Sequence, residues 1–143
     1  MVEKAFAIAL WLAGAGHFLL PVAGWQLPSR LNWKADLTKV HPFTRKLLWV
    51  YLCFITFVIL SFGTLTLIFR QEFLHGAPLA VALSVFIGFF WLSRVLVDFF
   101  YFENKDWPTG RRFIVAHVLL ISLDIFLAAT YLGLAIWHFS RKT

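Results

Sequence analysis

The chain has 143 residues, of which 61% are hydrophobic, 19% are aromatic and only 14% carry a charge. This composition leaves too little polar surface to cover a water-soluble globule of this size, so it predicts an integral membrane protein. The net charge of +6 is spread over segments between apolar runs, where Lys and Arg lie beside anionic lipid head groups. We therefore expect the lipid bilayer as the partner, and no nucleic acid.

Four long apolar runs predict the fold. At about 1.5 Å per residue, each run is long enough to cross a hydrocarbon layer of about 30 Å. The first run continues past the small residues 13–15, so we expect a membrane span there and not a cleaved signal peptide. Because consecutive spans cross in opposite directions, the sequence predicts an all-α, antiparallel four-helix transmembrane bundle, a single domain over residues 1–143. The expected spans are residues 5–23, 46–69, 79–102 and 112–137.

Helix-terminating and helix-starting residues suggest where these spans end. Pro21 is expected to end the first span, and Thr44, Pro78 and Thr109 are expected to start the other three. The connection from Gln71 to Pro78 is short enough to leave room only for a turn, which makes the second and third spans antiparallel neighbours.

The first connection carries an amphipathic pattern. Within residues 28–41, Trp33, Leu37 and Val40 recur at i, i+4 and i+7 among cationic side chains. The pattern predicts a short helix lying in the membrane interface. It has two interpretations: a strap along the membrane surface, or a lid over a site beneath it.

Basic residues predict the orientation. The first and third connections lie on one side of the membrane and hold most of the Lys and Arg, which places that side in the cytoplasm. We therefore expect a multi-pass protein of the bacterial inner membrane with both termini outside the cytoplasm. The basic residues of the richer side are Arg30, Lys34, Lys39, Arg45, Lys46, Lys105, Arg111 and Arg112.

Ionisable residues inside the apolar runs are the candidate functional residues. Arg94 and Asp98 lie one helical turn apart in the third span, where a charge is costly unless it is paired or hydrated. The couple is either a structural clamp or part of a working site. The helical rise places His17 and His117 in the same cytoplasmic leaflet, and Asp124 deeper, near the midplane. If the first, third and fourth spans adjoin, these residues form one polar pocket.

Several chemistries use such residues. His17 and His117 on facing helices would suit the axial ligands of haem b, and a quinone site could use the same residues as hydrogen-bond partners. His17, His117 and Asp98 are also ligand types for a metal, but no span carries a paired ligand motif, so no metal site is predicted.

Three functional hypotheses follow. The leading one is a small accessory or anchor subunit that holds haem b or a quinone through His17 and His117. The alternative is a membrane enzyme acting on a lipid-like substrate, with Asp98, Arg94 and Asp124 as candidate catalytic residues, although no nucleophile motif accompanies them. The third is a proton-linked transporter or channel. The expected protein partners are other membrane proteins or further copies of this chain.

Overall fold

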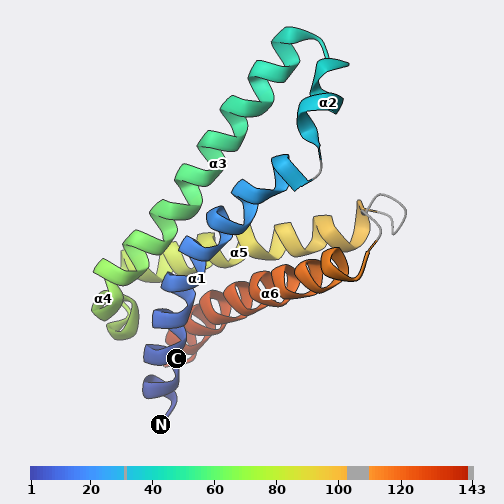
Figure 1. The fold of residues 1–143 in the computed structure, drawn as a ribbon. Helices are drawn as coiled ribbons and strands as arrows, with labels where there is room; N and C mark the ends of the chain where they lie inside the picture. The colour runs from blue at the N-terminus through green and yellow to red at the C-terminus, as the bar shows by residue number, and fades with distance from the viewer. Residues whose placement is uncertain (31, 103–109, 142–143) are drawn as a thin grey trace.

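The computed structural model describes residues 1–30, 32–102 and 110–141, with the side chains of residues 27–30 excepted. These residues form helices and contain no strand. Four of the helices are long and apolar enough to cross a membrane, which confirms the predicted all-α transmembrane bundle. Figure 1 labels the helices: α1 (Val2–Arg30), α2 (Trp33–Thr38), α3 (Pro42–Ile68), α4 (Arg70–His75), α5 (Pro78–Phe100) and α6 (Arg111–Ser140).

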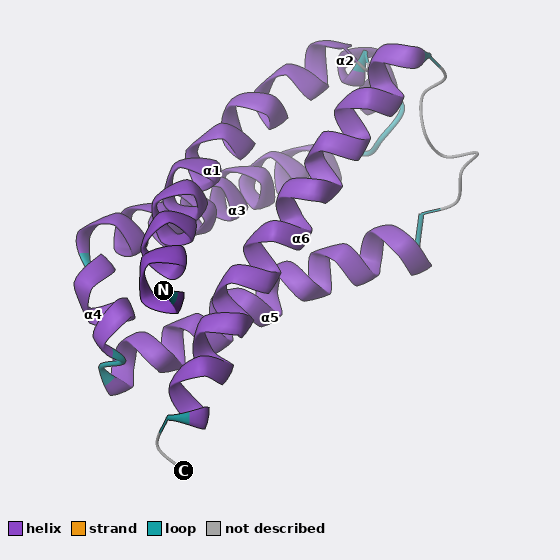
Figure 2. Cartoon of the chain, turned by 90° about the horizontal axis from the view of Figure 1, so that it is seen from below, coloured by secondary structure: helices purple, strands orange, loops and turns teal. Residues whose placement is uncertain are grey.

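The long helices pack as two pairs. α1 packs along α3, α5 packs along α6, and α1 also crosses α6 to join the pairs. Figure 1 shows the two pairs meeting at the end where α4 lies and diverging towards the end where α2 lies. Figure 2 shows the same arrangement from below, with the N-terminus and the C-terminus at the α4 end.

The first helix is longer than the sequence predicts. Pro21 does not end it, because α1 continues to Arg30. Proline cannot donate to the carbonyl one turn earlier, but a helix inside a membrane has no water to compete for the remaining backbone groups. The apolar part of α1 that could span a membrane is Val2–Gln26.

The predicted interfacial helix is shorter than residues 28–41. Residues 28–30 belong to α1, and Asn32 takes a left-handed backbone conformation with φ of 53° before α2 begins at Trp33. After α2, the side chain of His41 accepts a hydrogen bond from the amide of Phe43 at 3.3 Å. That cap starts α3 at Pro42, so the prediction of a start at Thr44 was wrong. The predicted start at Thr109, like Lys105, lies outside the described residues.

The tight connection between α3 and α5 contains a helix instead of a simple turn. α4 follows α3 with no gap, and its residues Phe73 and Leu74 are buried. Gly76, with φ of 72°, closes α4 in a conformation that glycine adopts without strain. The expected start of α5 at Pro78 is confirmed.

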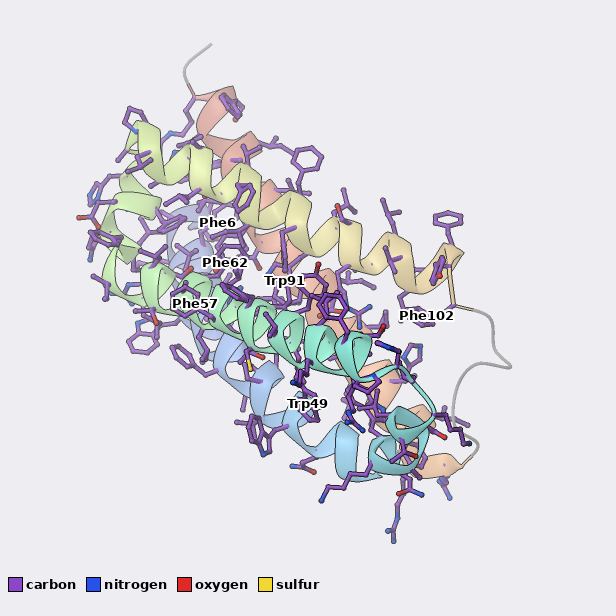
Figure 3. All side chains as sticks on the ribbon, turned by 90° about the horizontal axis from the view of Figure 1, so that it is seen from above. Phe6, Trp49, Phe57, Phe62, Trp91 and Phe102 are labelled. Carbon is purple, nitrogen blue, oxygen red and sulfur yellow. The ribbon has the colours of Figure 1, made fainter. Side chains whose placement is uncertain are left out.

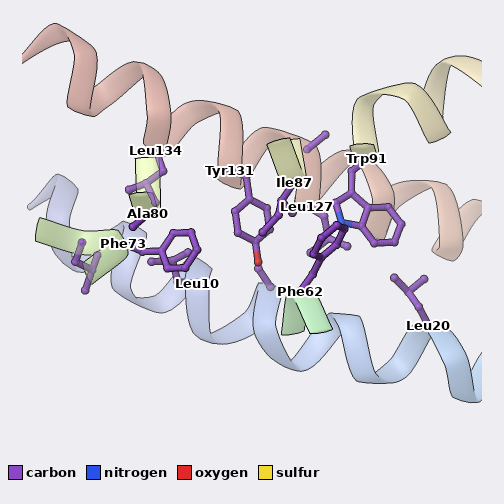
Figure 4. Close-up of a cluster of buried hydrophobic side chains, with 13 residues drawn as sticks. Leu10, Leu20, Phe62, Phe73, Ala80, Ile87, Trp91, Leu127, Tyr131 and Leu134 are labelled. Carbon is purple, nitrogen blue, oxygen red and sulfur yellow. The ribbon is translucent and has the colours of Figure 1, made fainter. Parts of the chain in front are cut away.

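Small and large side chains alternate where the two pairs meet. Hydrophobic burial does not drive helices together inside lipid, so close packing has to do so, and glycine allows the backbones to approach. A methyl group added at Gly63 of α3 would lie 2.8 Å from Cβ of His17 and 3.1 Å from the backbone oxygen of Gly14, both in α1. Figure 4 shows the buried side chains that fill the junction, among them Leu10, Ile87, Leu127, Tyr131 and Leu134.

The outer surface of the bundle is apolar, as a lipid-facing surface must be. On α3, Trp49 and Phe57 are exposed whereas Phe62, on the same helix, is buried against the other helices. Figure 3 shows this distribution of side chains around the ribbon. At the α4 end, the guanidinium of Arg141 stacks 4.7 Å from the ring of Trp137. A cation on an aromatic ring is typical of the water–lipid boundary.

The close approach of α1 and α3 predicts an asymmetry between two glycines. Gly63→Ala should lower the free energy of unfolding by about 1–3 kcal/mol, because the neighbouring backbone cannot move away from the new methyl group. Gly24→Ala is the matched control, since nothing lies within 4 Å of a methyl group added there. The control should be neutral or slightly stabilising. Unfolding in detergent measures both, and equal effects would contradict this account of the packing.

Candidate functional site

A carboxylate on α5 connects two ionisable side chains that reach the protein surface. Asp98 is 7% exposed, and its Oδ1 lies 3.8 Å from Nη1 of Arg94, one turn earlier on the same helix. Its Oδ2 lies 3.4 Å from Nε2 of His117 on α6. The side chains of Arg94 and His117 are 37% and 28% exposed, whereas Asp98 is enclosed behind them. We call these three residues the Asp98 group.

The helices place the Asp98 group where the two pairs of helices separate. It lies in the second half of α5 and the first turns of α6, the ends that diverge from α1 in Figure 1. α1 packs on α6 near Leu123 and near Trp137, both deeper along α6 than His117. This part of the α5–α6 pair is therefore left open at its surface, which explains why two of the three side chains stay partly exposed.

Asp124 lies two helical turns deeper on the same face of α6. It is 1% exposed, and among the described residues neither of its carboxylate oxygens has a hydrogen-bond partner. The charges of Arg94 and Asp98 both act on it, the first attracting and the second repelling a negative charge. Asp124 therefore lies deeper in the bundle than the Asp98 group. Unlike Asp98, it also has no ion-pair contact among the described residues.

His17 has a different environment, at the junction of all four long helices. Its Nε2 accepts a hydrogen bond from the indole N–H of Trp91 at 3.0 Å, so its Nδ1 carries the proton and donates to the carbonyl of Ala13 at 2.6 Å. The ring is fully buried and lies against the rings of Phe62 and Tyr131. Both nitrogens are occupied by hydrogen bonds within the fold.

This geometry does not fit the predicted haem. Two imidazoles that bind one iron must face each other across it, each with a nitrogen free to coordinate. His17 lies against Tyr131, which is about 21 Å along α6 from His117 by the helical rise. The Nε2 of His117 faces Asp98. The residues predicted to share a pocket thus divide into the Asp98 group with Asp124 on one side and His17 on the other.

Two inter-helix hydrogen bonds were not predicted. The hydroxyl groups of Thr66 and Tyr131 lie 2.6 Å apart and join α3 to α6. His138, for which the sequence favours an interfacial position, is instead buried and donates from Nε2 to the carbonyl of Phe73 at 2.8 Å. Each partner lies 65 residues away in the chain, so no local pattern could have paired them.

Comparison with protein-family models, with curated proteins and with solved structures finds no match to this chain. The chemistry of the Asp98 group and of Asp124 is therefore what indicates a function for this chain.

The Asp98 group predicts a difference between single and double substitutions. Asp98→Asn should lower the free energy of unfolding by about 2 kcal/mol, less than for a fully buried pair because the Arg94 side chain is 37% exposed. Replacing Arg94 by Leu and Asp98 by Met together should cost less, since no charge is left without its partner. Chemical unfolding in detergent measures both variants. If the double variant is the less stable one, the pair is not a clamp.

The hydrogen bonds of His17 predict the absorption spectrum of the protein. We expect no Soret band after expression in cells supplied with a haem precursor, because binding iron at His17 would break its bond with Trp91. The visible spectrum of the purified protein provides the measurement. A Soret band that disappears in both His17→Ala and His117→Ala would contradict this interpretation.

Proposed function

We propose that this chain is a small multi-pass membrane subunit that binds a quinone-type redox lipid at the Asp98 group. The observation that carries the proposal is the contact of a buried carboxylate with two partly exposed side chains from different helices. Such an arrangement presents the N–H donors of Arg94 at the surface of the bundle and holds them in place from behind.

The chemistry of the donors favours a quinone. Its ring and tail dissolve in hydrocarbon, whereas its two carbonyl oxygens need hydrogen-bond donors there. The guanidinium of Arg94 offers several N–H donors, of which only part face Asp98. The imidazole of His117 faces Asp98 through Nε2 and helps to hold the carboxylate that positions Arg94. Exposed apolar side chains such as Leu96 and Val118, on the same two helices, supply surface for the ring.

A role as a subunit follows from what these residues cannot do. Arg, Asp and His side chains bind and move protons, but they do not store electrons. A quinone that reacts at this site would therefore exchange electrons with a redox centre carried by another membrane protein. We propose such a protein as the partner of this chain.

The orientation is part of the proposal. Among the described residues, the α2 end of the bundle carries Lys34, Lys39, Arg45, Lys46, Arg111 and Arg112, and the α4 end carries Lys4, Arg70 and Arg141. The positive-inside rule then favours a cytoplasmic α2 end in a bacterial inner membrane, with both termini on the opposite side. The Asp98 group would lie in the cytoplasmic leaflet.

Quinone binding can be measured by quenching of tryptophan fluorescence with decylubiquinone in detergent. We expect saturable quenching, and the double variant Arg94→Leu/Asp98→Met, which removes the donors without stranding a charge, should weaken the affinity about tenfold, the factor that corresponds to a hydrogen bond of about 1.5 kcal/mol. His75→Leu is the control, because His75 is exposed at the α4 end and bonds to the carbonyl of Gln71.

Two outcomes would count against a quinone. Equal affinity in the Arg94→Leu/Asp98→Met double variant and in His75→Leu would mean that the quinone only dissolves in the apolar surface. Displacement of the quinone by a short-chain phosphatidylglycerol, at concentrations at which phosphatidylcholine has no effect, would point to an anionic lipid head group as the natural ligand.

A further inference from the structure

We infer that Asp124 is a proton-binding site inside the membrane. This inference does not depend on quinone binding. It rests on where Asp124 lies, on the charges that surround it and on the absence of a hydrogen-bond partner for its oxygens among the described residues.

The first step is the charge of the site. Arg94 and Asp98 carry opposite charges and neutralise each other, and His117 beside Asp98 can be neutral. An ionised Asp124 would then leave one uncompensated negative charge in a region that excludes water. A charge at that depth costs several kcal/mol, and binding a proton removes it.

The second step decides which carboxyl holds the proton. Asp98 has the guanidinium of Arg94 at 3.8 Å and the imidazole of His117 at 3.4 Å, and both can compensate a negative charge on it. Asp124 is 1% exposed and has no such contact among the described residues. The proton therefore belongs to Asp124.

The third step concerns the other ionisable groups near Asp124. On α1, His17 is neutral and uses both nitrogens in hydrogen bonds with Ala13 and Trp91, so it can neither compensate nor take the proton without breaking one of them. α3 packs on α1, and its only charged residues are Arg45 and Lys46 in its first turns. The proton on Asp124 is therefore not shared with His17.

Infrared spectroscopy tests the inference, because a protonated carboxylic acid has a carbonyl stretch that a carboxylate lacks. We expect this band at neutral pH in the full chain reconstituted in lipid nanodiscs, and a loss of the band in Asp124→Asn. The double variant Arg94→Leu/Asp98→Met is the matched control. It removes both charges of the pair, leaves the net charge around Asp124 unchanged and should keep the band.

The opposite results would overturn the inference: no band in the wild-type protein, a band that persists in Asp124→Asn, or a band that disappears in the Arg94→Leu/Asp98→Met double variant. If Asp124→Asn does not fold, Asp124→Glu replaces it in the test. The glutamate variant should keep the band at a shifted frequency, and an unshifted band would assign it to another carboxyl.

Discussion

The hydrogen bond from Trp91 to His17 is the interaction on which the rest of the structure depends. It joins α5 to α1 at the point where the two pairs of helices meet, and it fixes the tautomer of the imidazole that lies against Phe62 of α3 and Tyr131 of α6. One buried ring thereby contacts all four long helices. Lipid provides no hydrophobic force that would press helices together, so a satisfied polar contact of this kind determines which faces meet.

The glycines adapt the backbone to this ring. Gly63 lets α3 approach Cβ of His17, and Gly88 lets α5 approach Leu132 of α6 so closely that a methyl group would lie 2.7 Å from its side chain. Because the contacts are concentrated at this junction, the pairs separate beyond it. The Asp98 group lies in the separated part, and its partial exposure is a consequence of where the helices cross. This geometry connects the structure with the candidate function. His17 is buried in the junction and holds the helices together, whereas Arg94 and His117 are partly exposed where the pairs separate.

Much of the fold could be predicted from the sequence because hydrophobicity and length are local properties. The four spans, the antiparallel order and the start at Pro78 follow from them. The helix end predicted at Pro21 was wrong. The rule that proline ends a helix comes from helices in water, where water molecules can bond the backbone groups that proline leaves unpaired. The pairing of Arg94 with Asp98 was also predictable, since both lie on one helix one turn apart. The contact between Asp98 and His117 was not predictable, because it depends on how α5 packs against α6. The periodicity of the sequence does not determine that packing.

By itself, the sequence determined that this protein lies in a membrane and how often it crosses. It also determined which ionisable residues lie deep in the hydrocarbon, because the free energy of placing a charge there depends on the residue and its depth. Only the tertiary structure decided which of those residues meet. The sequence predicts the same role for His17 and His117. In the structure, the crossing of α1 over α6 buries His17 in the junction and leaves His117 at the surface beside Asp98. The same crossing encloses Asp124, whose depth was predictable and whose lack of a partner was not.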